Sequence, residues 1–302
     1  MTDSLSLLDA GQVRAALTYE ALIPAMERAL IDFSAGRVVQ PVRASVAVPG
    51  GEGLLLLMPA VYGDVMGVKL LTYNAANAAR GMPTYWTTVH LFRAETGEPL
   101  AIMDGAALTE MRTAAVSAAA ARRLAPANAR VLAVLGTGVQ ARAHVEALRT
   151  VRDFAEVRVW GRTPAHAAAF ARDAGATAME AEPAVRGADV VVTATSAAAP
   201  VLRGAWLAEG ALVLAVGSYG TASRELDDDA MRGAAVVVDS RAGAQAEAGE
   251  IVQTGAAIHA ELGEVLAGTA ALPRAHHVVF KSLGLAVEDV AAARLVWERR
   301  GG

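Results

Sequence analysis

The sequence predicts an α/β protein in which a doubly wound parallel sheet domain is inserted into a discontinuous α+β domain. Residues 119–286 alternate short apolar runs with helical segments, the pattern of a parallel sheet covered by helices. Residues 1–118 show helical periodicity first and then period-two runs joined by turns, which is typical of antiparallel strands. The last helical segment has no strand after it, so residues 287–302 are assigned to the first domain.

Composition narrows the class of protein. The chain has 302 residues, 54% of them hydrophobic, which suits one large or two ordinary domains. Its net charge of −4 and its lack of a basic run argue against a nucleic-acid partner. No apolar run approaches the ~20 residues that cross a bilayer, so no membrane partner is expected. The absence of cysteine excludes disulfides, and the N-terminus lacks a secretory pattern; we therefore expect a cytoplasmic protein.

The first domain is predicted to begin with two helices within residues 2–36. Asp9 and Thr18 are candidate N-caps, and Gly36 is a candidate C-cap. Strands of a mostly antiparallel sheet are then expected at residues 40–48, 53–59, 63–73, 84–93 and 99–103. A helix rich in small side chains follows at residues 104–124.

The second domain is predicted to contain six strands, each a short apolar run. They lie at residues 130–135, 156–160, 189–195, 212–217, 235–239 and 277–281. Helices between them are clearest at residues 141–150 and 164–174, and a final helix is expected at residues 288–300.

A glycine-rich turn follows the first of these strands. Its sequence, Gly136-Thr137-Gly138-Val139-Gln140-Ala141, has the G-x-G-x-x-A spacing of a Rossmann-type dinucleotide site. Gly136 allows the sharp turn, a side chain at Gly138 would keep phosphates away from the backbone, and a small Ala141 lets the helix pack closely on the strand. Gly136, Gly138, Val139 and Gln140 are therefore candidate cofactor-binding residues, with the pyrophosphate at the helix N-terminus.

The end of the next strand bears on which dinucleotide binds. An acidic residue there would accept hydrogen bonds from the ribose of NAD, but the sequence reads Gly161-Arg162-Thr163. Arg162 and Thr163 suit a 2′-phosphate instead, so NADPH is preferred, with NAD still possible. The alternative is that Arg162 is a solvated charge. Thr195, Val216 and Gly217 lie at the carboxyl ends of two later predicted strands, at the sheet edge that lines the cofactor crevice in such folds.

Several further motifs, spread over most of the chain, resemble those of the ornithine cyclodeaminase/mu-crystallin family. They are Leu57-Met58-Pro59, Gly67-Val68-Lys69, residues 104–115, 136–141, 247–251, 262–268 and 280–284, and Glu288-Asp289. The resemblance implies a homodimer with a discontinuous substrate and dimerisation domain and an inserted nicotinamide-dinucleotide domain. It also implies a small 2-amino or 2-imino acid substrate.

The resemblance also assigns residues to a substrate site. Arg43, Lys69 and Arg112 match the carboxylate-binding set of the family, and Arg112 also matches a position near the cofactor. Arg43 and Lys69 are cations within predicted apolar strands, and buried cations need anionic partners. A substrate anion fits all three positions; structural ion pairs are the alternative. Cleft-lining positions of the family are matched by Thr84, Thr195, Ser282 and Leu283.

Two departures from the family pattern concern catalysis. Family cyclodeaminases carry a glutamate just before the Met-Pro and an aspartate after a later Val-Gly. This sequence has Leu56-Leu57-Met58 in the first region and Tyr219 at the second. Leucine exchanges no proton, and tyrosine is a weak base at neutral pH.

We therefore predict NADPH-dependent reduction of a ketimine or pyrroline-carboxylate type 2-imino acid, or the reverse oxidation, with Lys69, Tyr219 or water as the proton donor. The alternatives are ornithine cyclodeamination with NAD and non-catalytic, NADPH-dependent ligand binding of the mu-crystallin type. The histidines lack metal-ligand spacing, so no metal is expected.

Overall fold

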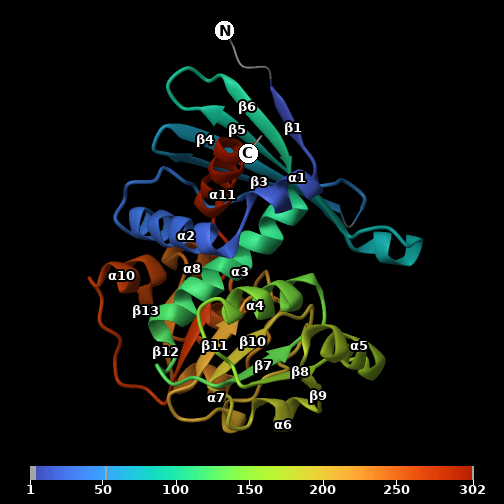
Figure 1. Ribbon diagram of the computed structural model, residues 1–302, viewed down its shortest axis with the longest axis vertical. Coiled ribbons are helices and arrows are strands. Elements are labelled where there is room, and N and C mark those ends of the chain that lie inside the picture. Colours follow the sequence, from blue (N-terminus) through green and yellow to red (C-terminus); the bar gives the residue numbers. More distant parts are fainter. Residues whose placement is uncertain (1–4, 52, 301–302) are drawn as a thin grey trace. The chain divides into compact units, whose positions relative to one another are not determined.

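A computed structural model describes residues 5–51 and 53–300 (Figure 1). It divides into two compact units, Met1–Arg112 with Leu285–Gly302, and Thr113–Gly284. The chain crosses from the first to the second within helix α3 (Gly105–Leu124), which the Asp104 carboxylate caps by accepting a hydrogen bond from the Ala107 amide at 2.8 Å. Within the described residues, no helix is long and apolar enough to cross a bilayer.

The first unit contains a six-stranded sheet in the order β1-β6-β5-β4-β3-β2. All neighbours are antiparallel except β1 and β6, which are parallel. The strands are β1 (Ser6–Leu8), β2 (Ala44–Ala47), β3 (Gly53–Tyr62), β4 (Val65–Asn74), β5 (Tyr85–Arg93) and β6 (Pro99–Asp104), and a 3-10 helix, η1 (Ala75–Arg80), joins β4 to β5.

The predicted helical content of residues 2–36 is only partly correct. Helices α1 (Ala10–Ala16) and α2 (Tyr19–Ser34) are present, and Asp9 caps α1 in a capping box with Gln12. Residues 6–8 instead form β1, because pairing with β6 supplies backbone partners that a short local pattern does not reveal. Residues 2–4 lie outside the described part of the chain.

Helix α11 (Ala286–Arg299) returns to this first unit and packs against α2, β3 and β4, as Figure 1 shows. The contact is close: a Cβ on Gly67 of β4 would lie 3.0 Å from Val290 Cγ2 of α11. Leu22, Met26 and Leu30 of α2 are fully buried in the same core. The N-terminal turn of α11 is buried as well, and this turn carries Glu288 and Asp289.

The second unit is an eight-stranded parallel sheet in the order β13-β12-β14-β11-β10-β7-β8-β9. Its strands are β7 (Val131–Leu135), β8 (Glu156–Trp160), β9 (Thr177–Ala178), β10 (Val190–Thr193), β11 (Leu212–Ala215), β12 (Ala234–Val238), β13 (Ile258–Glu261) and β14 (His277–Lys281). The helices are α4 (Val139–Arg149), α5 (Pro164–Ala174), α6 (Ala181–Val185), α7 (Asp228–Arg232), α8 (Arg241–Glu247), α9 (Gly249–Thr254) and α10 (Leu262–Ala267), and η2 (Gly204–Trp206) is a 3-10 turn.

This topology confirms the predicted α/β fold class, with two additions. The short edge strands β9 and β13 are not predicted, because an edge strand with exposed positions lacks the continuous apolar run of a buried one. Strands β10 and β11 also end two residues before the predicted limits. The residues released from the ladder form the loops that carry Thr195, Val216 and Gly217.

Candidate functional site

The glycine turn after β7 has the geometry of an anion-binding turn. Gly136 has φ +131°, and a Cβ there would lie 2.4 Å from the carbonyl oxygen of Ala194. Gly138 is the exposed N-cap of α4, and a Cβ on it would meet no atom within 4 Å. The space beside Gly138 is therefore open, and the first-turn amides of α4, which include those of Val139 and Gln140, have no intrahelical acceptors. This arrangement fits a dinucleotide pyrophosphate.

Arg162 and Thr163 follow β8 directly, and both are exposed. The Arg162 side chain makes no hydrogen bond or ion pair with another described residue. Gly161 keeps this loop against the glycine turn, since a Cβ there would lie 2.6 Å from Thr137 Cγ2. A guanidinium and a hydroxyl are thus available beside the turn for an anionic group.

The loops after β10 and β11 approach each other closely. A Cβ on Gly217 would lie 2.3 Å from both the amide nitrogen and the carbonyl oxygen of Thr195. The buried Glu225 carboxylate accepts hydrogen bonds from the Thr195 amide at 2.7 Å and from the Gly217 amide at 2.8 Å. Val216, between β11 and Gly217, donates to the Thr193 carbonyl at 3.0 Å. Sequence reasoning missed Glu225, which lies in a polar segment, Arg224 to Asp229, that resembles an ordinary helix start.

Ser282 and Leu283 come directly after β14 and are held by Asp239, which follows β12. The buried Asp239 carboxylate accepts from the Ser282 hydroxyl at 3.2 Å and from the Leu283 amide at 2.6 Å. Tyr219 lies in the loop after β11 with its side chain 44% exposed, and its carbonyl accepts from the Ser223 hydroxyl at 3.1 Å.

In the first unit, Lys69 and Arg112 belong to one buried ionic cluster. Lys69 Nζ of β4 lies 2.8 Å from Asp289 Oδ2. Arg112 of α3 pairs with Glu288 Oε2 through Nη1 at 2.6 Å and with Asp289 Oδ1 through Nε at 2.9 Å. The structural ion pairs weighed as the alternative for these two cations are therefore present. The sequence shows Glu288-Asp289 as a family motif but does not reveal that these acids meet the cations.

Arg43 lies next to this cluster, beside the strand that pairs with the strand of Lys69. It precedes β2 instead of lying within an apolar strand, so that expectation was wrong: β2 begins at Ala44, and its residues are exposed. Arg43 Nη1 lies 3.9 Å from Met58 Sδ, and Met58 is the cross-strand partner of Lys69. The half-buried Arg43 is close enough to lower the pKa of Lys69.

The electrostatics of the cluster leave Lys69 easier to deprotonate than an ordinary lysine. Burial is the largest cause and, with the Arg112 and Arg43 charges, lowers the pKa of Lys69 to about 8, although Asp289 opposes the shift. Lys69 and Arg112 pair with Glu288 and Asp289, and the positive charge of Arg43 lies close enough to act on Lys69.

Thr84 does not lie in this cluster. It precedes β5 and accepts a hydrogen bond from the Asn74 amide at 2.8 Å, five residues along β4 from Lys69. At the strand rise of about 3.4 Å per residue, that separation is about 17 Å. Thr84 instead lines a hollow of about 240 Å³ with Asn77 and Trp86.

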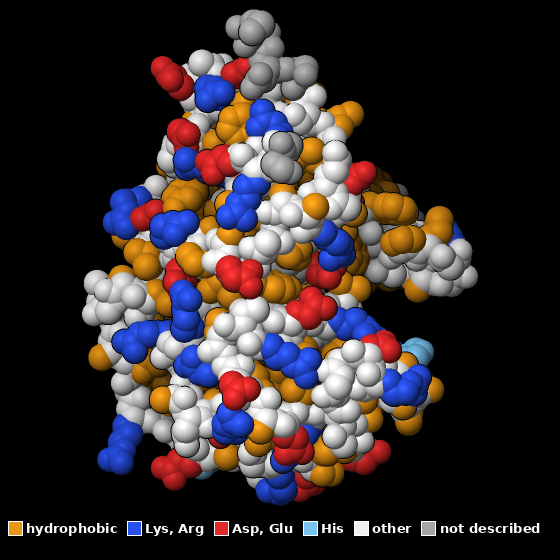
Figure 2. Space-filling view, viewed as in Figure 1, with side chains coloured by type: hydrophobic (Ala, Val, Ile, Leu, Met, Phe, Trp, Pro, Cys, Tyr) orange, Lys and Arg blue, Asp and Glu red, His pale blue; other side chains and the backbone are white. Residues whose placement is uncertain are grey.

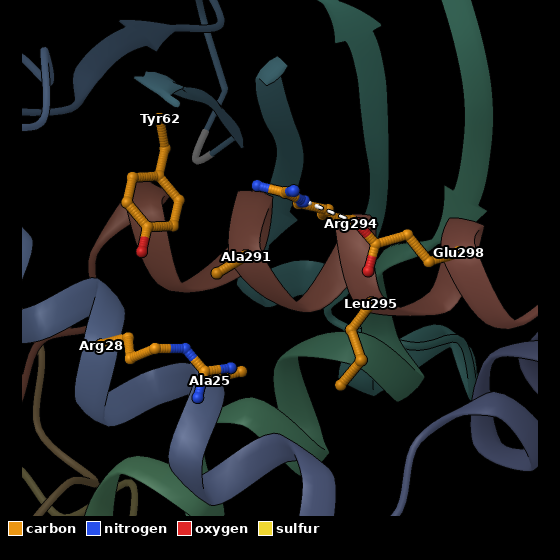
Figure 3. A pocket seen from close by; sticks show the side chains of 7 residues that line it. All are labelled: Ala25, Arg28, Tyr62, Ala291, Arg294, Leu295 and Glu298. Atoms are coloured by element: carbon orange, nitrogen blue, oxygen red, sulfur yellow. Dashed lines mark hydrogen bonds and ion pairs between the residues drawn. The ribbon is translucent and has the colours of Figure 1, made fainter. Parts of the chain in front are cut away.

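A second hollow of about 220 Å³ lies between α2, α11 and the end of β3 (Figure 3). Three of its polar side chains, Tyr62, Arg294 and Glu298, already have partners. Arg294 pairs with Asp64 at 2.8 Å and with Glu298 at 2.7 Å, and the Tyr62 hydroxyl donates to Asp32 at 2.8 Å. Burial raises the pKa of Tyr62 to about 12, so its hydroxyl stays neutral. None of the residues predicted for the site lines this hollow.

The doubly wound parallel sheet and its glycine turn define a protein of the Rossmann-type, dinucleotide-binding class. Comparisons with known proteins then give its family. The sequence model of the ornithine cyclodeaminase/mu-crystallin family matches residues 5–302, and the chain belongs to this family, as its motifs predicted.

Relatives in this family match over nearly the whole chain. Ketimine reductase mu-crystallin of Macropus fuliginosus is 44% identical over 287 residues, covering 92% of this chain and 91% of that protein. Delta(1)-pyrroline-2-carboxylate reductase 2 of Burkholderia ambifaria is 38% identical over 303 residues, covering 97% of each. The structure of Thermococcus litoralis Delta(1)-pyrroline-2-carboxylate reductase with NADH and L-proline superposes with a TM-score of 0.90 at 31% identity, covering 98% of this chain and 97% of that one.

Proposed function

We propose that this chain is an NAD(P)H-dependent oxidoreductase that reduces the C=N bond of a small 2-imino acid of the ketimine or pyrroline-carboxylate type, or oxidises the corresponding amino acid. Its kinship with ketimine and pyrroline-carboxylate reductases supports this activity. The observation that carries the proposal is that the three predicted carboxylate-binding cations lie together: Lys69 and Arg112 meet at Asp289, and Arg43 lies beside Met58, the cross-strand partner of Lys69.

The residues of the cluster would divide the work as follows. Arg43 and Arg112 hold the substrate carboxylate and fix the orientation of the C=N bond, and such positioning supplies several kcal/mol of barrier reduction. When bound, the reduced nicotinamide supplies the hydride for C2. Lys69, with its pKa lowered to about 8, donates a proton to the imine nitrogen or keeps that nitrogen protonated. Tyr219 and water stay the alternative donors.

Cyclodeamination of ornithine finds less support in the residues of the first unit. Leu56 is 5% exposed and lies on the same face of β3 as Met58, the cross-strand partner of Lys69. The region that carries a glutamate in family cyclodeaminases is therefore apolar here, and it offers no base for amine deprotonation.

The experiment that tests the proposed function is a substrate panel with purified protein. NADPH or NADH is mixed with cyclic 2-imino acids, or with 2-oxo acids plus amines, and the nicotinamide absorbance is followed. Consumption of reduced cofactor with a 2-imino acid is expected. A protein that binds NADPH but consumes none across the panel would be a ligand-binding protein of the mu-crystallin type. Ammonia and proline formed from ornithine without net cofactor change would make it a cyclodeaminase.

The glycine turn gives a matched pair of substitutions that separates cofactor binding from folding. Gly138→Ala should leave the free energy of unfolding nearly unchanged, because its Cβ meets no atom within 4 Å. It should nevertheless weaken dinucleotide binding by about tenfold or more, a loss of ~1.4 kcal/mol. Gly136→Ala should lower the free energy of unfolding by about 1–3 kcal/mol, since it combines φ +131° with a 2.4 Å contact. Denaturant unfolding and cofactor titration measure both; equal behaviour of the two variants would contradict the assignment.

Arg162 is expected to set the preference for the phosphorylated cofactor. Arg162→Ala should weaken NADPH binding by about 1.5–3 kcal/mol, the contribution of a hydrogen bond to a charged group, and should leave NADH binding nearly unchanged. Arg162 is exposed, so its replacement should leave the free energy of unfolding within about 0.5 kcal/mol. Titration of both cofactors against both proteins measures the effect, and equal NADH and NADPH affinities in the unsubstituted protein would contradict it.

We further propose that the chain forms a homodimer through the sheet of its first unit. Large apolar side chains are exposed there, and Figure 2 shows hydrophobic side chains gathered on the arm where β4 and β5 meet. The exposed apolar side chains of the whole first unit include Leu7, Val39, Val46, Tyr73, Tyr85 and Trp86. An apolar groove of about 400 Å³ is lined by Val39, Pro59, Val61, Val68 and Phe92. Such a surface is typical of an interface. Sedimentation should give twice the mass of 31.0 kDa, and a monomer at micromolar concentration would contradict the proposal.

A further inference from the structure

Glu225 is a fully buried carboxylate that accepts hydrogen bonds from two separate loops at the carboxyl edge of the second unit's sheet. Oε1 accepts from the amide and hydroxyl of Thr195, at 2.7 and 2.8 Å. Oε2 accepts from the Thr193 hydroxyl at 2.9 Å and from the amides of Gly217 and Ser218 at 2.8 and 3.3 Å. One carboxylate thus ties the end of β10 to the end of β11.

The backbone of Glu225 makes hydrogen bonds of its own to other segments of the chain. Its carbonyl accepts from the amides of Val201 and Leu202 at 2.8 and 3.0 Å, and its own amide donates to Glu250 Oε1 at 2.9 Å. The carboxylate is therefore held in place by a third segment of the chain.

Glu250 and Lys281 form a second layer behind Glu225, and both are fully buried. Glu250 accepts from the Ser218 hydroxyl at 2.6 Å and lies 3.2 Å from Lys281 Nζ, which also donates to the Ser218 carbonyl at 2.8 Å. Burial alone would raise the pKa of Glu250, but Lys281 and the Ser218 hydroxyl outweigh it and hold the pKa below its ordinary value. Glu250 is therefore a stable anion that fixes the Ser218 loop.

We propose that Glu225 is a positioning residue, which acts through Thr195 and Gly217 to shape the part of the dinucleotide site that holds the nicotinamide. The inference rests on the proposed function, because it takes the glycine turn as the pyrophosphate site. In doubly wound sheets the ligand lies outside the carboxyl ends of the strands. The adenosine half then lies toward Arg162 after β8, so the other half lies over the loops after β10 and β11, on the opposite side of β7.

The arrangement explains why a carboxylate, and not an amide, stands at this position. All five groups that meet Glu225 are donors or hydroxyls, and a carboxylate presents acceptors on both oxygens. Glutamine would turn an NH₂ group toward the amide of Thr195 or toward those of Gly217 and Ser218. The loop that faces the NH₂ group would then lose its hydrogen bonds to residue 225, while the other loop would keep them.

The test compares two ligands with Glu225→Gln. NADPH spans the whole site, whereas adenosine 2′,5′-bisphosphate reaches only the adenosine half. We expect NADPH to bind about tenfold to a hundredfold more weakly, as the loss of charge-assisted hydrogen bonds would give, with the bisphosphate affinity unchanged. Titrations are made at a temperature where circular dichroism shows the variant folded. An unchanged NADPH affinity, or an equal loss for both ligands, would overturn the proposal.

Two further variants keep the test decisive. Asp227→Asn is the matched control, because Asp227 lies two residues away but accepts from the Gly204 and Ala230 amides, both at 2.9 Å, and not from the loops. It should leave both affinities unchanged. If Glu225→Gln does not fold, Glu250→Gln takes its place. It should weaken NADPH binding by a smaller factor and leave the affinity for the bisphosphate unchanged. An equal loss of affinity for both ligands would overturn the proposal. Failure of the unsubstituted protein to bind NADPH at all would instead count against the proposed function.

Discussion

Lys69→Met should lower kcat for imine reduction by about a hundredfold or more while the Kd for NADPH stays within about twofold. Loss of a positioned general acid costs 10²–10⁴ in rate by usual magnitudes. The cofactor turn belongs to the other compact unit of the chain, so its affinity should not follow Lys69. Methionine is an apolar replacement of similar length, and Asp289 keeps its pairing with Arg112 at 2.9 Å. Steady-state kinetics and cofactor titration measure the two quantities.

Comparison with Tyr219→Phe tests which side chain donates the proton to the imine nitrogen. Tyr219 is 44% exposed, in contrast to Lys69 at 2%. If Lys69 gives the proton, Tyr219→Phe should retain turnover within a fewfold, and reduction should decline above about pH 8 as Lys69 loses its charge. Near-normal turnover of Lys69→Met together with inactive Tyr219→Phe would transfer the role to the tyrosine.

The parts of the fold that the sequence predicts well are those in which local signals coincide. Helix α5 has the predicted bounds, because Thr163-Pro164 starts it and Gly175, at φ +59°, ends it. Strands β8 and β14 also match, since each is a short run with clear flanks. Strand β1 is missed because three residues hold too little local pattern, and its strand state depends on pairing with β6, about 95 residues away.

For the candidate site, the sequence predicts the cations but not their partners. Lys69 and Arg112 stand out because charged residues interrupt apolar or small-sided segments. Their carboxylates, Glu288 and Asp289, are some 176 residues beyond Arg112, and only the packing of α11 on the first unit brings them together. Glu225 is a different case, since a polar segment before a helix gives no sign that one of its acids is fully buried.

Asp289→Asn should lower the free energy of unfolding by about 3–5 kcal/mol near neutral pH. The substitution removes the carboxylate that pairs with both Lys69 and Arg112, and buried cations without their partner are costly. Lys69 is 2% exposed and Arg112 is 3% exposed, so water cannot replace the lost interaction without opening the core. Denaturant unfolding of the two proteins gives the difference.

The same variant predicts a specific dependence on pH. The pKa of Lys69 is about 8 in the folded protein and 10.5 in an unperturbed lysine. Between pH 8 and 10.5 the unfolded chain therefore binds more protons than the folded one, and the contribution of Lys69 to the free energy of unfolding rises with pH. Without Asp289 the pKa of Lys69 falls further, because that carboxylate raises it. A neutral Lys69 no longer needs an anion. The stability deficit of Asp289→Asn should therefore be largest well below pH 8 and should shrink as the pH rises to about 8. Above that pH it should stay nearly constant, because Lys69 is then neutral in both folded proteins.

Glu288→Gln provides the matched control for this pH dependence. Glu288 pairs with Arg112 at 2.6 Å and is not among the charges that set the pKa of Lys69. Because Arg112 keeps its proton throughout this range, the deficit of Glu288→Gln should stay nearly constant from about pH 6 to pH 9. A deficit of Asp289→Asn below about 1 kcal/mol, or one that is equally constant with pH, would show that Lys69 does not depend on Asp289 for its charge.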